Sequence, residues 1–145
     1  MVIIMSGIPG SGKSTYAREH FPHANILSAD DFFVRNGIYT FDPKLLKDAH
    51  EFCLRRFAWD SQVQDQTLIV DNTNTTALEI CPYAALALAY GHELKIITLK
   101  CDVETAFKRN KHNVPLESIQ RMHDRLEKRV LPKRWPNEVR VRGML

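Results

Sequence analysis

The stretch GIPGSGKS, residues 7–14, matches the pattern G-x-x-x-x-G-K-S at every defined position. It follows the apolar run VIIM, residues 2–5, and precedes a helical stretch from about Lys13 to His20. A strand, a glycine-rich turn and a helix in this order form the context in which the pattern binds phosphate. The glycines let successive backbone N–H groups point inward, and the N-terminus of the helix adds a favourable dipole. The stretch therefore predicts a loop that holds the phosphates of a nucleotide.

Two side chains of this loop carry chemistry. Lys13 is expected to reach the β- and γ-phosphates of ATP, and the Ser14 hydroxyl to ligate Mg²⁺. The backbone N–H groups around them are expected to bind the remaining phosphate oxygens. Thr15 follows directly and is also explained as an ordinary residue of the helix. The predicted nucleotide site of the loop comprises Gly7, Ile8, Pro9, Gly10, Ser11, Gly12, Lys13, Ser14 and Thr15.

Apolar runs and helical stretches alternate along the rest of the chain. Strands are predicted at residues 25–27, 67–70, 93–99 and, as an edge strand, 138–142. Helices are predicted from Asp42 and Pro43 to about Gln64, and over residues 77–90, 103–110 and 116–129, while residues 35–41 form a loop. Strands separated by helices indicate an α/β fold with a parallel sheet and helices on both faces.

Composition favours one compact domain over residues 1–145. Hydrophobic residues make up 44% of the chain and charged residues 26%, as in ordinary globular proteins. The N-terminal apolar run is too short for a membrane span or a signal peptide, so we expect a cytoplasmic protein with no membrane association. The three cysteines have no CxxC spacing, which argues against a disulfide framework or a zinc site.

The net charge of +3 is unevenly distributed. Residues 1–100 hold 9 Lys and Arg against 11 Asp and Glu, whereas residues 101–145 hold 11 against 6, so the two parts carry −2 and +5. A basic C-terminal third suits a polyanionic ligand, although a solvated helix face explains the same charges.

Carboxylates end two of the predicted strands. Asp71 follows the apolar run at 67–70, in the manner of an acid that holds Mg²⁺, and Asp30 and Asp31 follow the strand at 25–27. Because the carboxyl ends of parallel strands lie at the same edge of a sheet, all three carboxylates are expected beside the phosphate loop. One of the adjacent pair, for which we favour Asp30, can then take a proton from an acceptor hydroxyl. A capping turn is the alternative explanation of this pair.

With these residues placed, the chain resembles the kinase domain of the polynucleotide kinases. The blocks GIPGSGKST, SADDFF, VDNTNTT and KRNKHNVPLESIQRMHDRLE carry the resemblance, which spans about residues 1–128. That family transfers the γ-phosphate of ATP to a nucleic-acid 5′-hydroxyl on a P-loop kinase fold with strand order 2-3-1-4-5. The resemblance implies Asp30 as the base and Arg109 as a lid arginine that binds the nucleotide and neutralises charge on the phosphates, with Lys13 as the third catalytic residue.

The chain departs from the phage members of that family at two positions. Phe33 stands where they carry an arginine that grips the neighbouring phosphate of the acceptor, and Arg35 is the nearest replacement. Their strand-end acid aligns with Asn72, so Asp71 takes the role from a shifted position. Tyr39 is an open candidate for stacking a base, with packing as its alternative. Phe41, His50, His112, Asn113 and the arginines 55, 56, 121 and 125 are further open candidates for contacts with nucleic acid or nucleotide.

Three interpretations remain open at this stage. The first is an ATP-dependent polynucleotide 5′-hydroxyl kinase, whose partners are a nucleoside triphosphate, Mg²⁺ and a nucleic-acid end. The second is a P-loop kinase of a small hydroxylated acceptor such as a nucleoside, sugar or antibiotic. The third is a nucleotide-binding switch without catalysis, for which the paired aspartates and Arg109 would be unnecessary.

Overall fold

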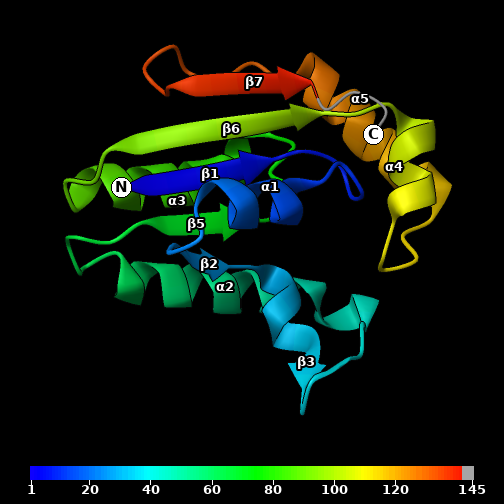
Figure 1. Ribbon diagram of the computed structural model, residues 1–145, viewed down its shortest axis with the longest axis horizontal. Helices are drawn as coiled ribbons and strands as arrows, with labels where there is room; N and C mark the ends of the chain where they lie inside the picture. Colours follow the sequence, from blue (N-terminus) through cyan, green and yellow to red (C-terminus); the bar gives the residue numbers. More distant parts are fainter. Residues whose placement is uncertain (142–145) are drawn as a thin grey trace.

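The apolar run at the N-terminus is the central strand of a parallel sheet (Figure 1). Strand β1 (Val2–Ser6) is fully buried and pairs with β5 (Leu68–Asp71) on one side and β6 (Leu94–Lys100) on the other. Strands β2 (Asn25–Leu27) and β7 (Asn137–Val141) form the two edges. Every pair in this sheet is parallel, and the order β2-β5-β1-β6-β7 is 2-3-1-4-5 when only its own strands are counted. The predicted fold is therefore confirmed.

Apolar side chains point to both faces of the sheet along β1, which explains why helices cover both faces. Because successive side chains of a strand point to opposite faces, Val2 and Ile4 join one apolar cluster and Ile3 and Met5 another. The first cluster contains side chains of α2 (Leu46–Asp60) and α3 (Ala77–Ala89), and the second those of α1 (Lys13–His20). Helix α1 thus covers one face, while α2 and α3 cover the other.

A third group of helices closes the end of the sheet at which the strands terminate. Helices α4 (Val103–Arg109) and α5 (Leu116–Lys128) lie at this end in Figure 1, beyond the carboxyl ends of β1 and β6. Ala106 of α4 and Ile119 of α5 pack with Ile8 in a separate buried cluster. The two helices are therefore fixed directly against the phosphate loop.

The segment between β2 and α2 differs from the sequence prediction. A 3₁₀ turn (Ala29–Phe33) is followed by an antiparallel hairpin of β3 (Val34–Arg35) and β4 (Ile38–Tyr39), where a loop was expected. The two residues between these strands have φ angles of 52° and 77°, the left-handed conformations that a tight hairpin turn requires. They are Asn36 and Gly37, and an Asn-Gly pair is the usual sequence for such a turn.

Helix α2 is shorter than its pattern predicted at both ends. Asp42 caps a 3₁₀ turn (Pro43–Leu45) rather than the α-helix itself. At the other end the amide of Gln66 donates to the carbonyl oxygen of Asp60 at 2.6 Å, and the Ser61 hydroxyl donates to that of Ala58. These side chains satisfy carbonyls of the last turn, so the helix ends at Asp60 and not near residue 64.

The structure describes residues 1–141, so the last residue of the edge strand predicted at 138–142 lies outside the described residues. Within the described part, no helix combines the length and the apolar character needed to cross a membrane.

Candidate active site

The phosphate loop joins the carboxyl end of β1 to the first residue of α1. Gly10 and Gly12 have φ angles of 83° and 93°, which side chains rarely adopt, and Gly12 is the N-cap of the helix. A Cβ atom on Gly10 would also lie 2.8 Å from the carbonyl carbon of Ala106, because α4 presses on the loop at this point. The glycine at position 10 is thus required by two independent constraints, one of backbone conformation and one of packing.

Lys13 is the first residue of α1 and folds back over the loop. Its ammonium group donates to the carbonyl oxygen of Ile8 at 3.1 Å. Burial lowers the pKa of Lys13, while the negative charges of Asp71 and Asp30 act in the opposite direction. The phosphate-loop lysine and the two strand-end carboxylates predicted from sequence therefore lie in one electrostatic site.

Ser14 and Asp71 meet beside this lysine. The Ser14 hydroxyl donates to Asp71 Oδ2 at 2.6 Å, across 57 residues of sequence. A hydroxyl and a carboxylate are the hard oxygen donors that Mg²⁺ prefers, so the pair fits the predicted metal. Asn72 stands where the phage polynucleotide kinases carry their strand-end acid. Its side-chain oxygen accepts from the Ala29 amide at 2.8 Å, away from Ser14.

The remaining residues of the predicted nucleotide site have different surroundings. Gly7 donates its N–H to the carbonyl oxygen of Thr73, and the Ile8 side chain is fully buried in the cluster beneath α4. Pro9 and Thr15 are half-buried. The Ser11 hydroxyl is buried without a hydrogen-bond partner among the described residues. Since buried polar atoms are nearly always paired, this oxygen fits a site completed by a phosphate group.

Asp30 and Asp31 have separate environments although they are adjacent. Asp31 accepts from the Ser28 N–H at 3.3 Å in a capping box and lies 3.2 Å from Arg56 Nη1. The Arg56 guanidinium also stacks over Phe52. Asp31 is therefore held by its own turn and by α2, whereas Asp30 is the member of the pair whose charge reaches Lys13.

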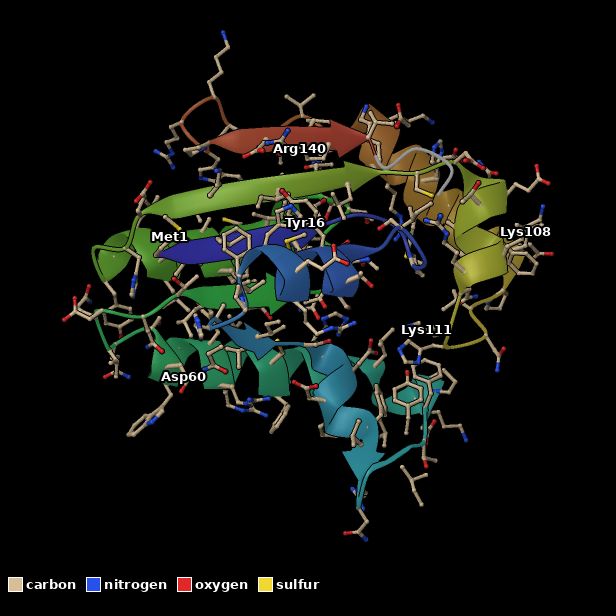
Figure 2. The ribbon with its side chains drawn as sticks, in the orientation of Figure 1. Met1, Tyr16, Asp60, Lys108, Lys111 and Arg140 are labelled. Carbon is tan, nitrogen blue, oxygen red and sulfur yellow. The ribbon has the colours of Figure 1, made fainter. Side chains whose placement is uncertain are left out.

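Asp30 is contacted from two opposite walls. From the hairpin, the Tyr39 hydroxyl donates to Asp30 Oδ1 at 3.4 Å. From the loop between α4 and α5, His112 Nε2 lies 3.7 Å from Asp30 Oδ2. Figure 2 shows the neighbouring Lys111 in that loop, which approaches the hairpin segment from above. Sequence reasoning left both aromatic residues as open candidates and gave no reason to join them.

Arg109 is the last residue of α4 and is half-buried. It lies three residues after Ala106, and therefore near the face of α4 that packs on the loop. Burial raises the pKa of the neighbouring Cys101 thiol, and the Arg109 charge opposes that rise. The structure thus places Arg109 on the helix that touches the phosphate loop.

Arg129 was not identified from the sequence, yet it ties the strand ends together. Its guanidinium donates to Ser6 Oγ at 2.5 Å, to the carbonyl oxygen of Asn74 at 2.9 Å and to Thr98 Oγ1 at 2.8 Å. Asn74 in turn donates its side-chain amide to the carbonyl oxygen of Met5. Arg129 thereby links the residue before the phosphate loop to the segment after Asp71.

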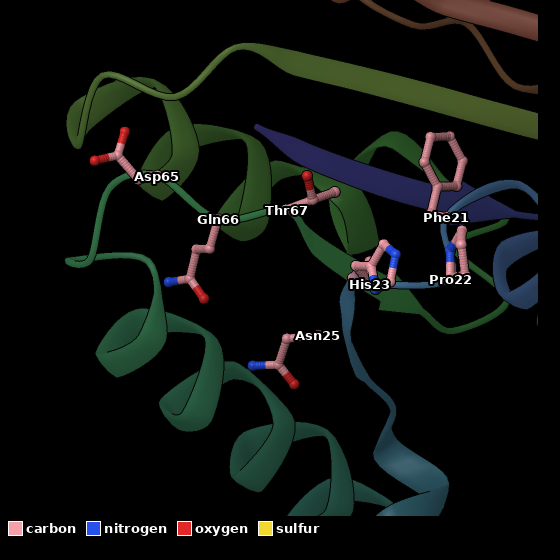
Figure 3. A pocket seen from close by; sticks show the side chains of 8 residues that line it. Phe21, Pro22, His23, Asn25, Asp65, Gln66 and Thr67 are labelled. Carbon is pink, nitrogen blue, oxygen red and sulfur yellow. The ribbon is translucent and has the colours of Figure 1, made fainter.

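A pocket lies at the opposite end of the strands, away from the phosphate loop (Figure 3). It has a volume of about 530 Å³ and is lined by residues 21–25 and 65–67, at the amino ends of β2 and β5. None of the predicted site residues lines it. The candidate active site is instead the surface around Lys13 at the carboxyl ends of the strands.

Comparison with known proteins identifies the family. The family model AAA_33, described as an AAA domain, matches residues 2–129. The chain belongs to this family. The match to this AAA domain family covers the phosphate loop, both strand-end acid motifs, α4 and α5, and ends at Arg129. A P-loop domain of this kind binds a nucleotide, and its kinase-like fold agrees with the arrangement of Lys13, Ser14 and Asp71.

A curated relative and two solved structures extend this result. Human NEDD4-binding protein 2 is 40% identical over 131 residues, which cover 84% of this chain but only 7% of that protein. The chain thus spans a small part of the relative's length. In the Pnkp1/Rnl/Hen1 RNA repair complex, a similar chain has a TM-score of 0.69 at 20% identity, covering 87% of this chain and 43% of that one. A gluconokinase from Sinorhizobium meliloti 1021 has a TM-score of 0.62 at 17% identity, covering 99% and 83%. At these identities the two structures show a shared P-loop kinase fold.

Proposed function

We propose that this protein is an ATP-dependent kinase that transfers the γ-phosphate to the 5′-hydroxyl of a polynucleotide. One observation carries the proposal: Asp71 accepts from the Ser14 hydroxyl at 2.6 Å, and the negative charges of Asp71 and Asp30 both act on the ammonium group of Lys13. A group that binds phosphate, a carboxylate suited to a metal and a second carboxylate suited to a proton are thereby gathered at one point. A protein that only bound nucleotide would not need the second carboxylate.

The proposed reaction assigns one task to each residue. Lys13 and the loop N–H groups hold the β- and γ-phosphates, and Arg109 neutralises charge that develops on them. Ser14 and Asp71 would hold Mg²⁺, which would supply further charge neutralisation at the phosphates. Asp30 accepts the proton of the acceptor hydroxyl as that oxygen bonds to the γ-phosphorus and the bond to the β,γ-bridging oxygen breaks, so ADP leaves.

The choice of a polynucleotide acceptor rests on sequence blocks and on charge. The four blocks that resemble polynucleotide kinases lie around this one site in the fold. The basic C-terminal third also offers exposed cations to a polyanion, since Arg121, Arg125 and Lys128 are exposed along α5. A cytoplasmic location is part of the proposal and fits an ATP-dependent reaction.

The test is phosphate transfer from ATP labelled in its γ-phosphate to a panel of acceptors. The panel contains 5′-hydroxyl oligonucleotides of RNA and DNA, nucleosides and sugars. We expect label on the oligonucleotides, and label on the small acceptors alone would refute the polynucleotide assignment. No transfer to any acceptor would favour a nucleotide-binding switch.

The paired aspartates offer a matched control for the catalytic assignment. Asp30→Asn keeps the size of the side chain but removes its basicity, so turnover should fall by about 10²- to 10⁴-fold with nucleotide affinity retained. Asp31→Asn should lower thermal stability more than turnover, since Asp31 contacts Ser28 and Arg56. A larger loss of turnover in Asp31→Asn would overturn the assignment of the base.

A further inference from the structure

Two aromatic rings from distant parts of the chain meet beside the proposed base. Tyr39 belongs to strand β4, and His112 to the loop between α4 and α5. Their ring centroids are 4.3 Å apart, and the ring planes are tilted by 34°. Each ring also contacts one oxygen of the Asp30 carboxylate. The two rings therefore form a pair at the point where an acceptor hydroxyl must approach Asp30.

The Tyr39 side of the pair rests on the core of the protein. The Tyr39 ring packs edge-on against Phe33 at 6.2 Å between centroids, and Phe33 is 4% exposed. Burial and the charge of Asp30 raise the pKa of Tyr39 to about 12, so its hydroxyl stays protonated and donates to the carboxylate. This ring is thus a fixed wall whose orientation is set by two contacts.

His112 belongs to a loop whose residues form hydrogen bonds with one another. Asn110 donates its side-chain amide to the carbonyl oxygen of Val114 at 2.6 Å and accepts from the His112 N–H at 3.2 Å. Across the site, this loop meets the Tyr39 ring and the Asp30 carboxylate. A base can enter between the two rings only if this loop moves away from the hairpin, because the rings are in contact at 4.3 Å between centroids.

We propose that Tyr39 and His112 form a stacking slot for the nucleobase next to the reacting hydroxyl of the acceptor, which distinguishes an acceptor that carries a base from a sugar. The proposal rests on the proposed function and deepens it. In a 5′-terminal nucleoside, the reacting hydroxyl and the base are joined through one ribose. A base held between the rings therefore keeps its 5′-hydroxyl close to Asp30. Flat faces of this kind accept any base, so the slot recognises the presence of a base and not its identity.

The test compares two oligonucleotides that differ only at the 5′-terminal residue. One carries an ordinary 5′-terminal nucleoside, and the other an abasic residue with the same 5′-hydroxyl. Stacking of one base changes affinity by about 5- to 150-fold, so kcat/KM should be lower by a factor in this range for the abasic oligonucleotide. Tyr39→Leu and His112→Ala should each reduce this preference, whereas Tyr39→Phe, which keeps the ring, should retain it.

Phe41 supplies a matched control in the same segment. It is 45% exposed and packs edge-on against Phe33 at 5.1 Å, as Tyr39 does, but it carries no hydroxyl that could donate to Asp30. Phe41→Leu should therefore keep the full preference for the base. A 5′-terminal 2-aminopurine gives a readout that does not depend on turnover, since its fluorescence is quenched by stacking in the wild type and less so in Tyr39→Leu.

The outcomes separate this proposal from the proposed function. Equal kcat/KM for both oligonucleotides would overturn the slot while leaving the kinase intact. Phosphorylation of nucleosides alone would overturn the polynucleotide assignment but not the slot, and phosphorylation of sugars alone would overturn both. Loss of the preference in Phe41→Leu, to the same extent as in Tyr39→Leu, would assign the effect to the hairpin as a whole and would also overturn the slot.

Discussion

The contact between the phosphate loop and α4 makes Gly10 a demanding test of the structure. Gly10→Ala adds one carbon at a φ of 83°, where an L-residue costs about 1–2 kcal/mol. That carbon would also lie 2.8 Å from the Ala106 carbonyl carbon, and overpacking of this kind costs about 1–3 kcal/mol. The expected loss in the free energy of unfolding is therefore about 2–5 kcal/mol.

Gly91 provides the control because it isolates the packing contribution. Its φ is 77°, close to that of Gly10, but a Cβ atom there would meet nothing within 4 Å. Gly91→Ala should thus cost only the conformational part, about 1–2 kcal/mol. Equilibrium urea denaturation of the two variants measures the difference, which should be about 1–3 kcal/mol. The reasoning fails if Gly10→Ala is no less stable than Gly91→Ala.

The same two variants test whether the contact between α4 and the phosphate loop affects the binding of ATP. Displacing α4 from Gly10 also displaces Arg109, so ATP should raise the melting temperature of Gly10→Ala less than that of the wild type. Gly91→Ala, which lies at the end of α3 away from the phosphate loop, should respond to ATP as the wild type does.

Three further predictions follow from individual side chains. Lys13→Ala should abolish the stabilisation of the protein by ATP, measured by thermal shift, while the circular dichroism spectrum stays native; a normal ATP response would contradict the proposed site. Asp102, the N-cap of α4, has a pKa lowered chiefly by the N–H that it accepts, so its stabilising effect is present above its ordinary pKa and lost as pH falls through the lowered value. The difference in melting temperature between the wild type and Asp102→Ala should accordingly shrink between pH 6 and pH 3, and a constant difference would exclude this linkage. Cys81 is exposed whereas burial raises the thiol pKa of Cys53 and Cys101, so a thiol reagent should label Cys81 first in the folded protein, and rapid labelling of all three would show that the two sites are open.

Features determined by local sequence were predictable. The boundaries of α1 and β2 were predicted to the residue, because a glycine-rich loop and a short apolar run bounded by polar residues define them locally. The hairpin at residues 34–39 was missed although its signal was present, since Asn36 and Gly37 form the pair that favours this turn. The strand order came from the resemblance to a known family and not from periodicity.

Contacts between distant segments were predictable only where a general rule of the fold brings the segments together. The sequence predicted that Asp30 and Asp71 lie near Lys13, because the carboxyl ends of parallel strands lie at the same edge of a sheet. The approach of His112 to Tyr39 follows no such rule, because it depends on how the loop after α4 packs across the site. Arg129 likewise gives no local pattern, since its three acceptors come from three separate segments.

The position of Arg129 along the chain has a consequence for folding. Ser6 and Arg129 are 123 residues apart, and Arg129 and Asn74 are 55 apart. Contacts of such separation form late, because the chain must close a long loop before they stabilise anything. Strand β1 and the phosphate loop are made first during synthesis, but the guanidinium that ties Ser6 to Asn74 arrives only after α5 has been made. We therefore expect a ribosome-bound chain that is stalled before Arg129 emerges to bind ATP poorly, and to acquire affinity for ATP once this residue can reach the strand ends.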